Sequence, residues 1–151
     1  MSHTKLLKPM ALCLMLVACG SGYKEHKDDR APAAEPSFKL AEGNAFGARL
    51  QWLNGPQTCT DKTLQSTAVL SLLTPEGKTP ATVTDVTVKP WMKVHGHGTG
   101  NWQPTITERG DQSRTYDITG ICFIMAGPWE LNIEATVDGL HGKLEWSVEV
   151  P

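Results

Sequence analysis

Near the end of the chain apolar and polar residues alternate, and this alternation restricts the class of fold more than any other feature. Apolar side chains occupy every second position over residues 129–137 and again over residues 144–150. In an extended strand, a period of two places all of these side chains on one face. A helix needs apolar residues three and four positions apart, and no long stretch of the sequence has that spacing. The sequence therefore predicts strands with one buried face.

Similar segments precede these two, and turn-forming residues separate them. Strands are predicted over residues 46–52, 66–73, 83–88, 105–108, 114–118 and 121–125. Pro90 is expected to end the third of them, and the apolar run 121–125 is typical of a central strand buried on both faces. About seven short strands at this spacing predict an all-β fold, an immunoglobulin-like β-sandwich, formed as one domain by residues 38–151.

The first residues have the anatomy of an export signal. Lys5 and Lys8 form a positive start, and the apolar core over residues 10–17 is too short to be a transmembrane helix. The sequence Leu16-Val17-Ala18-Cys19 resembles the end of a bacterial lipoprotein signal, in which the cysteine is kept and lipidated. Residues 1–18 are therefore predicted to be a signal peptide, and Cys19 the lipid-bearing start of the mature chain. Plain secretion with cleavage elsewhere is the alternative.

Residues 19–37 are mostly polar and punctuated by proline. Such a segment has almost nothing to bury, so it is predicted to be a disordered tether. Through a lipid on Cys19 the domain would be anchored to a membrane of the cell envelope. Gly20 is not an aspartate, a feature that favours the periplasmic side of the outer membrane over the inner membrane.

The charge balance and the absence of known motifs exclude two classes of function. With 14 basic and 16 acidic residues and a net charge of −2, the chain has no basic field for nucleic acid. It contains no HExxH motif, no phosphate-cradling glycine loop and no nucleophile elbow with a Ser–His–Asp set. The sequence predicts neither a nucleic-acid binder nor an enzyme.

Two cysteines remain for the domain once Cys13 leaves with the signal and Cys19 takes the lipid. Cys59 and Cys122 are expected to lie outside the cytoplasm, where an isolated pair most often forms a disulfide. Closing a loop of that size would stabilise the fold by roughly 4 kcal/mol. The alternative is a pair of thiolate ligands or a redox pair, although the spacing gives no CxxC motif.

Soft metal ligands gather in one short stretch, residues 89–100. It holds Met92, His95 and His97, and Met125 is a further thioether on a later loop. If the stretch is extended, both imidazoles leave the same face and can share one ion. Two imidazoles with one or two thioethers suit copper better than calcium, magnesium or a structural zinc site. The alternative is an exposed turn whose imidazoles bond to carbonyls, with both methionines in the core.

Two segments also occur in an order and separation found in a known family. They are Pro90-Trp91-Met92 with His95-Gly96-His97-Gly98, then Tyr116, then Phe123-Ile124-Met125-Ala126-Gly127-Pro128-Trp129-Glu130-Leu131. Over roughly residues 83–150 they resemble the YtkA-like domain. The methionine, glycine and Pro-Trp pair before a strand are also similar to FixH-type periplasmic domains.

This resemblance implies a small exported β-sandwich, often a lipoprotein, linked in several cases with copper handling or cytochrome oxidase assembly. It places the family's Met/His loop on Met92, His95 and His97, and its second methionine on Met125. Lys93 and Val94 stand where the richer version of the loop often has another methionine. The expected function is therefore binding or delivery of copper by a lipid-anchored envelope protein.

Two other functions remain open at this stage. One is an interaction module without a metal, docking on an envelope protein partner through loops that carry Trp91, Trp102 and Trp129, since tryptophan is enriched at binding hot spots. Packing of these indoles in the core is the alternative for each. The other is a structural or solute-binding lipoprotein with a small ligand between its loops.

Overall fold

The computed structural model describes residues 37–60, 64–110 and 112–151. The predicted signal peptide, Cys19 and nearly all of the predicted tether lie outside the described residues. Within them, the regular structure consists of strands and one short 3-10 turn, η1 (Glu42–Asn44). No helix among these residues has the length and apolar character needed to cross a membrane.

The described residues form nine strands. These are β1 (Phe38–Leu40), β2 (Gly47–Asn54), β3 (Ser66–Leu73), β4 (Val83–Met92), β5 (His97–Gly98), β6 (Thr105–Glu108), β7 (Thr115–Ile121), β8 (Gly127–Val137) and β9 (Leu140–Val150). The predicted all-β class is confirmed. Seven of the nine strands have four residues or more, while β1 and β5 are too short to give a pattern in the sequence.

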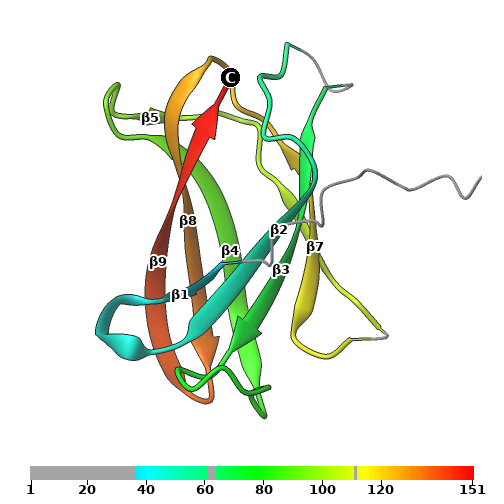
Figure 1. Ribbon diagram of the computed structural model, residues 1–151, viewed down its shortest axis with the longest axis vertical. Helices are drawn as coiled ribbons and strands as arrows, with labels where there is room; N and C mark the ends of the chain where they lie inside the picture. The colour runs from blue at the N-terminus through cyan, green and yellow to red at the C-terminus, as the bar shows by residue number, and fades with distance from the viewer. Residues whose placement is uncertain (1–36, 61–63, 111) are drawn as a thin grey trace, which may run out of the picture. The chain divides into compact units, whose positions relative to one another are not determined.

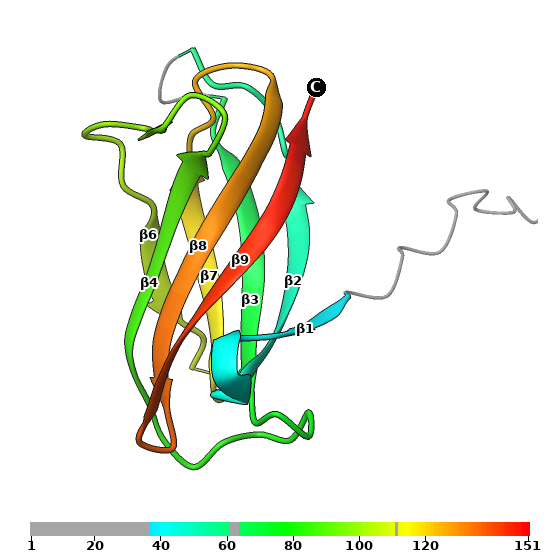
Figure 2. The same ribbon diagram turned by 90° about the vertical axis from the view of Figure 1, so that its left-hand side faces the viewer.

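The strands form two antiparallel sheets that lie face to face (Figure 1). One sheet has the order β1-β2-β3-β7-β6 and the other has the order β5-β4-β8-β9. Figure 2 shows β4, β8 and β9 in one layer and β2, β3 and β7 in the layer behind it. The molecule is thus a β-sandwich, as the alternation predicted.

The core between the sheets consists of the apolar side chains that alternate along each strand. In β8, every second residue from Trp129 to Val137 is buried, and in β9 Leu144, Trp146, Val148 and Val150 are buried in the same way. Phe46, Phe123 and Trp129 are the largest fully buried rings in this core. Burial of this apolar face stabilises the sandwich, at about 25 cal/mol for each Å² removed from water.

The predicted central strand over residues 121–125 is wrong. β7 ends at Ile121, and the next residues form a loop in which Phe123 makes only an isolated parallel bridge to Thr58. Ile121 and Phe123 are fully buried beneath this loop, whereas Ile124 and Met125 are exposed. The run is apolar because its first half fills the core, not because it is a strand between two others.

Pro90 does not end β4, because the strand continues through it to Met92. Pro90 pairs with Leu131 in the β4–β8 ladder. Its carbonyl oxygen points to the β5 side, since a Cβ placed on Gly98 would lie 2.9 Å from that oxygen. The N–H and C=O of one strand residue point to the same side, so the missing donor faces β5 and costs the β4–β8 ladder nothing. This extension carries Trp91 and Met92 onto the sheet.

The turn between β8 and β9 allows a first prediction. Asp138 and Gly139 both have positive φ, 49° and 82°, as a tight hairpin turn requires. The Asp138 Oδ1 atom accepts a hydrogen bond of 2.8 Å from the Thr82 backbone N–H, which ties the turn to the start of β4. Asp138→Ala removes this acceptor and places alanine in the left-handed region. We expect a loss of about 1–2 kcal/mol in the free energy of unfolding in urea.

Asp138→Asn is the matched control, because asparagine keeps a side-chain oxygen and tolerates positive φ. Its free energy of unfolding should stay within about 0.5 kcal/mol of the wild type. Equal losses in the two variants would contradict the role given to this oxygen.

Candidate functional site

The predicted metal ligands lie at one end of the sandwich, on the hairpin that joins β4 to β5. This segment is not extended, as the sequence interpretation supposed, but turns back on itself. The Met92 carbonyl accepts hydrogen bonds from the backbone N–H groups of His95 (3.2 Å) and Gly96 (2.9 Å). Gly96 has φ 67°, which glycine adopts without steric cost. The turn therefore brings His97 back beside Met92.

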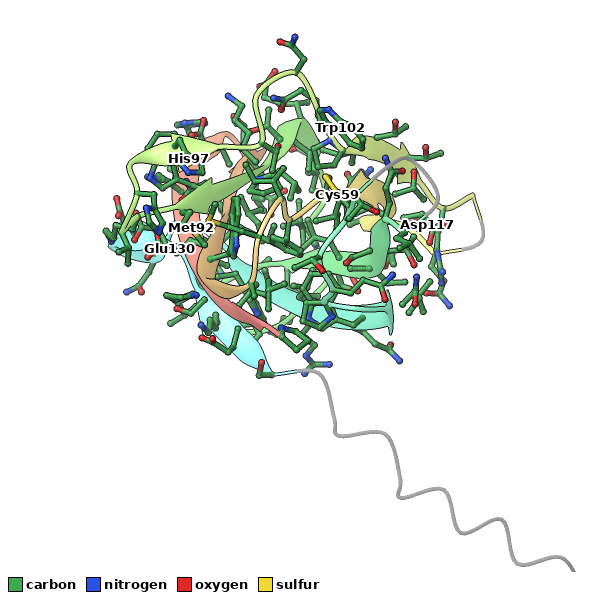
Figure 3. All side chains as sticks on the ribbon, turned by 90° about the horizontal axis from the view of Figure 1, so that it is seen from above. Cys59, Met92, His97, Trp102, Asp117 and Glu130 are labelled. Atoms are coloured by element: carbon green, nitrogen blue, oxygen red, sulfur yellow. A yellow bond between two sulfur atoms is a disulfide. The ribbon has the colours of Figure 1, made fainter. Side chains whose placement is uncertain are left out.

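Met92 and His97 are direct partners in the β4–β5 ladder, so their side chains leave the same face of the sheet. That face is the core side, because Met92 is only 1% exposed. Figure 3, seen from above, shows the two residues at the same corner of the sandwich. The Met92 methyl group lies against Gly127, where an added Cβ would be 3.7 Å from it. Met92 is thus a core residue at the boundary with the hairpin.

The two imidazoles lie next to each other even though the backbone between them turns. The ring centroids of His95 and His97 are 5.8 Å apart and the ring planes differ by 31°. A metal–nitrogen bond of about 2.0–2.1 Å puts each bound ring centroid about 3.2 Å from the ion, so two rings on one ion have centroids at most about 6.4 Å apart. The observed separation lies inside this limit and is compatible with a shared ion held at a wide angle.

One ring nitrogen of His97 already makes a hydrogen bond, and this bond determines what the other ring nitrogen can do. Its Nδ1 lies 3.0 Å from the Gly98 carbonyl oxygen. A carbonyl oxygen only accepts, so Nδ1 carries the proton and donates it. In the neutral ring Nε2 then keeps its lone pair and is free to bind a metal. Fixing one nitrogen to orient the other is the usual arrangement for a histidine ligand.

Trp129, on β8, forms the wall behind His97. Its ring meets His97 edge-on with centroids 6.2 Å apart, and it meets Phe123 at 5.4 Å. The Trp129 Nε1–H donates to the Met125 carbonyl at 2.9 Å. The buried Trp129 indole therefore contacts both the hairpin, through His97, and the loop of Met125, through its N–H.

The four predicted ligands therefore do not share one environment. His95 and Met125 are exposed, His97 is half-buried and Met92 is buried. The structure joins Met92 to His97 and His97 to His95. Met125 is linked to them through its carbonyl and Trp129, while its side chain is 39% exposed at the surface. The interpretation that both methionines are core residues is right for Met92 and wrong for Met125.

Lys93, which follows Met92, is paired with two carboxylates. Its Nζ lies 3.3 Å from a carboxylate oxygen of Glu130 and 3.3 Å from one of Glu145. Hydrogen bonds to these two carboxylates raise the pKa of Lys93, while bonds from Lys143 and then Lys93 lower the pKa of Glu145. The positive charge beside the hairpin is thus balanced on the outer surface of the sheet.

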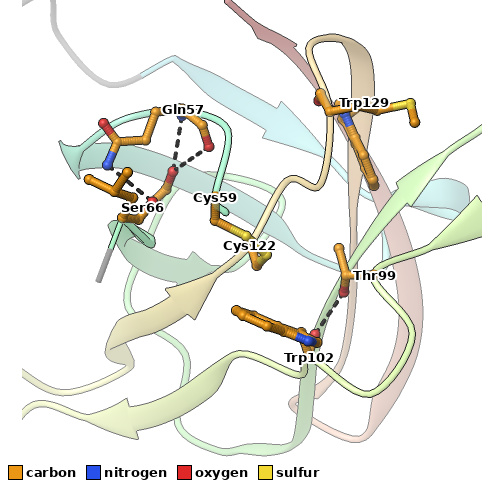
Figure 4. Close-up of a disulfide and its surroundings, with 9 residues drawn as sticks. Gln57, Cys59, Ser66, Thr99, Trp102, Cys122 and Trp129 are labelled. Atoms are coloured by element: carbon orange, nitrogen blue, oxygen red, sulfur yellow. Dashed lines mark hydrogen bonds between the residues drawn. A yellow bond between two sulfur atoms is a disulfide. The ribbon is translucent and has the colours of Figure 1, made fainter. Parts of the chain in front are cut away.

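The described residues also contain other side chains of metal-binding types. Among residues 37–60, 64–110 and 112–151, no group of three or more His, Cys, Asp and Glu side chains converges on a possible metal position. Cys59 and Cys122 are joined in a disulfide, with Cα atoms 5.3 Å apart (Figure 4), so they offer no thiolate. A metal at this end would need the thioethers in addition to the two imidazoles.

The three tryptophans of the interaction hypothesis lie in different surroundings. Trp129 is 1% exposed and belongs to the core, so it cannot dock a partner. Trp91 is 38% exposed on the outer face of β4, and Trp102 is half-buried in the loop before β6. The contact between Trp129 and His97 was not predicted from the sequence. The alternation along β8 does put Trp129 on the core face, but only the register between strands shows what it contacts.

Comparison of the chain with protein-family models, with curated proteins and with solved structures found no match. The likeness to YtkA-like and FixH-type domains therefore depends only on the residues quoted for it.

Proposed function

We propose that this protein is a lipid-anchored component of the cell envelope that binds copper and delivers it to a partner. The proposed ligands are the imidazoles of His95 and His97 and the thioethers of Met92 and Met125. The adjacent rings of His95 and His97, with Nε2 of His97 free, are the observation that carries the proposal.

The donor set determines the choice of metal. Imidazole and thioether ligands favour copper, and Cu(I) in particular accepts thioethers. Calcium and magnesium need oxygen ligands, and a structural zinc site usually has thiolates. The lysine next to Met92, Lys93, is paired with Glu130 and Glu145, which reduces its repulsion of a bound ion.

The position of the ligands supports delivery rather than storage. His95 and Met125 are exposed, so a partner protein can reach the ion and replace them one at a time. His97 and Met92 stand on the rigid sheet, which keeps the other half of the site in place. A lipid on Cys19 would hold the protein close to membrane-bound partners, such as an oxidase under assembly.

The proposal predicts a copper affinity that depends on both imidazoles. The compact unit Ala34–Pro151 should bind Cu(I) with a Kd below about 10 μM in a competition titration with a chromogenic chelator. Changing both His95 and His97 to alanine should weaken binding at least about 100-fold, because it removes two of the ligands. Met92→Leu and Met125→Leu should each weaken Cu(I) binding more than Cu(II) binding.

His141→Ala is the matched control, because His141 lies on β9, where its ring contacts Thr136, outside the proposed site. It should bind copper as the wild type does. No binding tighter than about 10 μM, or binding unchanged by the double alanine variant, would rule out the proposal.

A second candidate is an adaptor that docks on an envelope protein without a metal. Two exposed apolar side chains favour it: Trp91 on β4 and Val94, which is 74% exposed in the turn after β4. A partner captured from membranes that stays bound in a strong chelator, and is lost in Trp91→Ala, would favour this function over copper delivery.

A further inference from the structure

A second possible binding site lies beside the loop that follows β5, and none of its lining residues is a proposed copper ligand. A hollow of about 370 Å³ opens there, next to the ends of β3, β6 and β7. The described residues that line it carry no charge, and they are Gln65, Asn101, Trp102, Gln103, Thr105 and Gly120. Three carboxamides, a hydroxyl and an indole therefore face one small space.

The loop is fixed in place by its own hydrogen bonds. The buried Thr99 hydroxyl donates to the Trp102 carbonyl at 2.7 Å, and the Trp102 N–H donates to the Thr99 carbonyl at 3.3 Å. The Gln103 Nε2 donates to the Gly100 carbonyl at 3.1 Å, which leaves the Gln103 amide oxygen as an acceptor. Figure 4 shows the Trp102 indole extending towards the Cys59–Cys122 disulfide. A site built on such a loop needs little ordering when a ligand binds.

Gly120, on β7, helps to keep the hollow open. It has φ 74°, and a Cβ at this position would lie 3.5 Å from the Gln65 Oε1 atom. A side chain here would be strained and would project towards the Gln65 carboxamide. Backbone therefore forms this part of the lining, and the carboxamide stays accessible.

A second hollow of about 290 Å³ lies against the same loop. It is lined by Lys89, Pro90, Trp91, Gly98, Thr99, Gly100 and Gln103. Gln103 lines both hollows. The Trp91 indole lies over Gly98, where an added Cβ would be 3.5 Å from its Cε3 atom, and it is still 38% exposed. Each hollow thus contains one indole, and the two share a carboxamide.

We propose that these two hollows bind a neutral oligosaccharide, with one sugar ring on Trp102 and another on Trp91. A sugar ring has an apolar face of C–H groups that packs on an indole, and a rim of hydroxyls. Each hydroxyl both donates and accepts, as each carboxamide does, so Gln65, Asn101 and Gln103 match that rim.

Other ligand classes fit this lining less well. An anion or a cation would find no opposite charge among the described residues that line the hollow of Trp102, and Lys89 lines only the other hollow. An apolar molecule would leave the carboxamides without partners. A peptide would need apolar anchors in addition to the polar groups, and the hollow of Trp102 offers a single indole.

The test uses the compact unit Ala34–Pro151 and four probes: glucose, N-acetylglucosamine and the β-1,4-linked tetramer of each. At least one tetramer should bind with a Kd of about 0.1–1 mM by calorimetry, and should change the tryptophan fluorescence. Trp102→Ala should weaken this binding by about tenfold, whereas Trp102→Phe, which keeps an aromatic face, should stay within about threefold. Trp91→Ala should weaken tetramer binding and leave monomer binding unchanged.

Asn101→Ala is a second variant for which folding is not at risk, because Asn101 is exposed in its loop. It should weaken tetramer binding by about fivefold. The double variant of His95 and His97 should bind the tetramer normally, because neither histidine lines the two hollows. The proposal is overturned if neither tetramer binds at about 10 mM, or if Trp102→Ala and Asn101→Ala both bind like the wild type. The proposal would also be overturned if a peptide selected from a library binds at these hollows and neither saccharide tetramer does.

Discussion

Replacing Cys59 and Cys122 together by alanine is expected to lower the free energy of unfolding by about 4 kcal/mol, because their disulfide joins positions with a sequence separation of 63. Without it, the unfolded chain gains the conformational freedom of the segment between them. The folded state also loses a local restraint, since the Cys59 N–H donates to the Phe123 carbonyl at 2.8 Å beside the bond. Guanidinium unfolding followed by circular dichroism measures the difference.

Reductant provides the control for this prediction. The wild type with its disulfide reduced should unfold close to the double alanine variant, and reductant should not affect that variant. In the reduced wild type, amide exchange should increase first at Cys59, whose N–H donates to the Phe123 carbonyl beside the disulfide. A loss below about 1 kcal/mol would show that the disulfide adds little to the stability of the sandwich.

Trp129→Ala is expected to cost about 3–5 kcal/mol, because it leaves a large cavity in the core. The side chain is 1% exposed and contacts Phe123 in the core and His97 at the rim. The substitution also removes the hydrogen bond from the Trp129 N–H to the Met125 carbonyl, so the loop of Met125 loses its connection to the hairpin. Chemical unfolding measures the loss, and NMR chemical shifts of His95 and His97 should report the loosened hairpin.

Trp129→Phe separates the two effects of this residue. Phenylalanine keeps a ring in the core but has no N–H for Met125, so we expect a smaller cost of about 1–2 kcal/mol. If the proposed copper site is real, this variant should bind copper more weakly while remaining folded. Copper binding unchanged in Trp129→Phe would mean that the Met125 loop does not contribute to the site.

The sandwich was predictable because its longest strands have one buried and one exposed face. Trp129, Leu131 and Ile133 lie on the core side of β8, where a period of two places them. The same rule extends along β4, since Val88, Pro90 and Met92 are all buried. The sequence prediction ended this strand at Pro90, because proline lacks the backbone N–H donor. Whether the missing N–H weakens a ladder depends on which neighbouring strand it faces, and the sequence alone does not show this.

The candidate site was only partly predictable, because its parts come together through contacts between strands. The spacing of His95 and His97 suggested one extended segment, yet the rings meet across a turn that Gly96 permits. The apolar run after Gly120 looked like a strand because composition does not distinguish burial under a loop from burial within a sheet. No local pattern indicated that the Trp129 ring contacts His97 or that its N–H binds the Met125 carbonyl.

The proline in β4 also affects how copies of the protein meet. β5 pairs only with Trp91 and Met92, so the rest of this ten-residue strand is the edge of its sheet. An open edge of that length is a template on which another chain can add a strand. Here Pro90 offers no donor, Lys89 adds charge and Asp85 breaks the register with φ 56°. Growth of the sheet from one molecule into the next is therefore blocked along this side, and copies of the domain can be concentrated without polymerising through this edge.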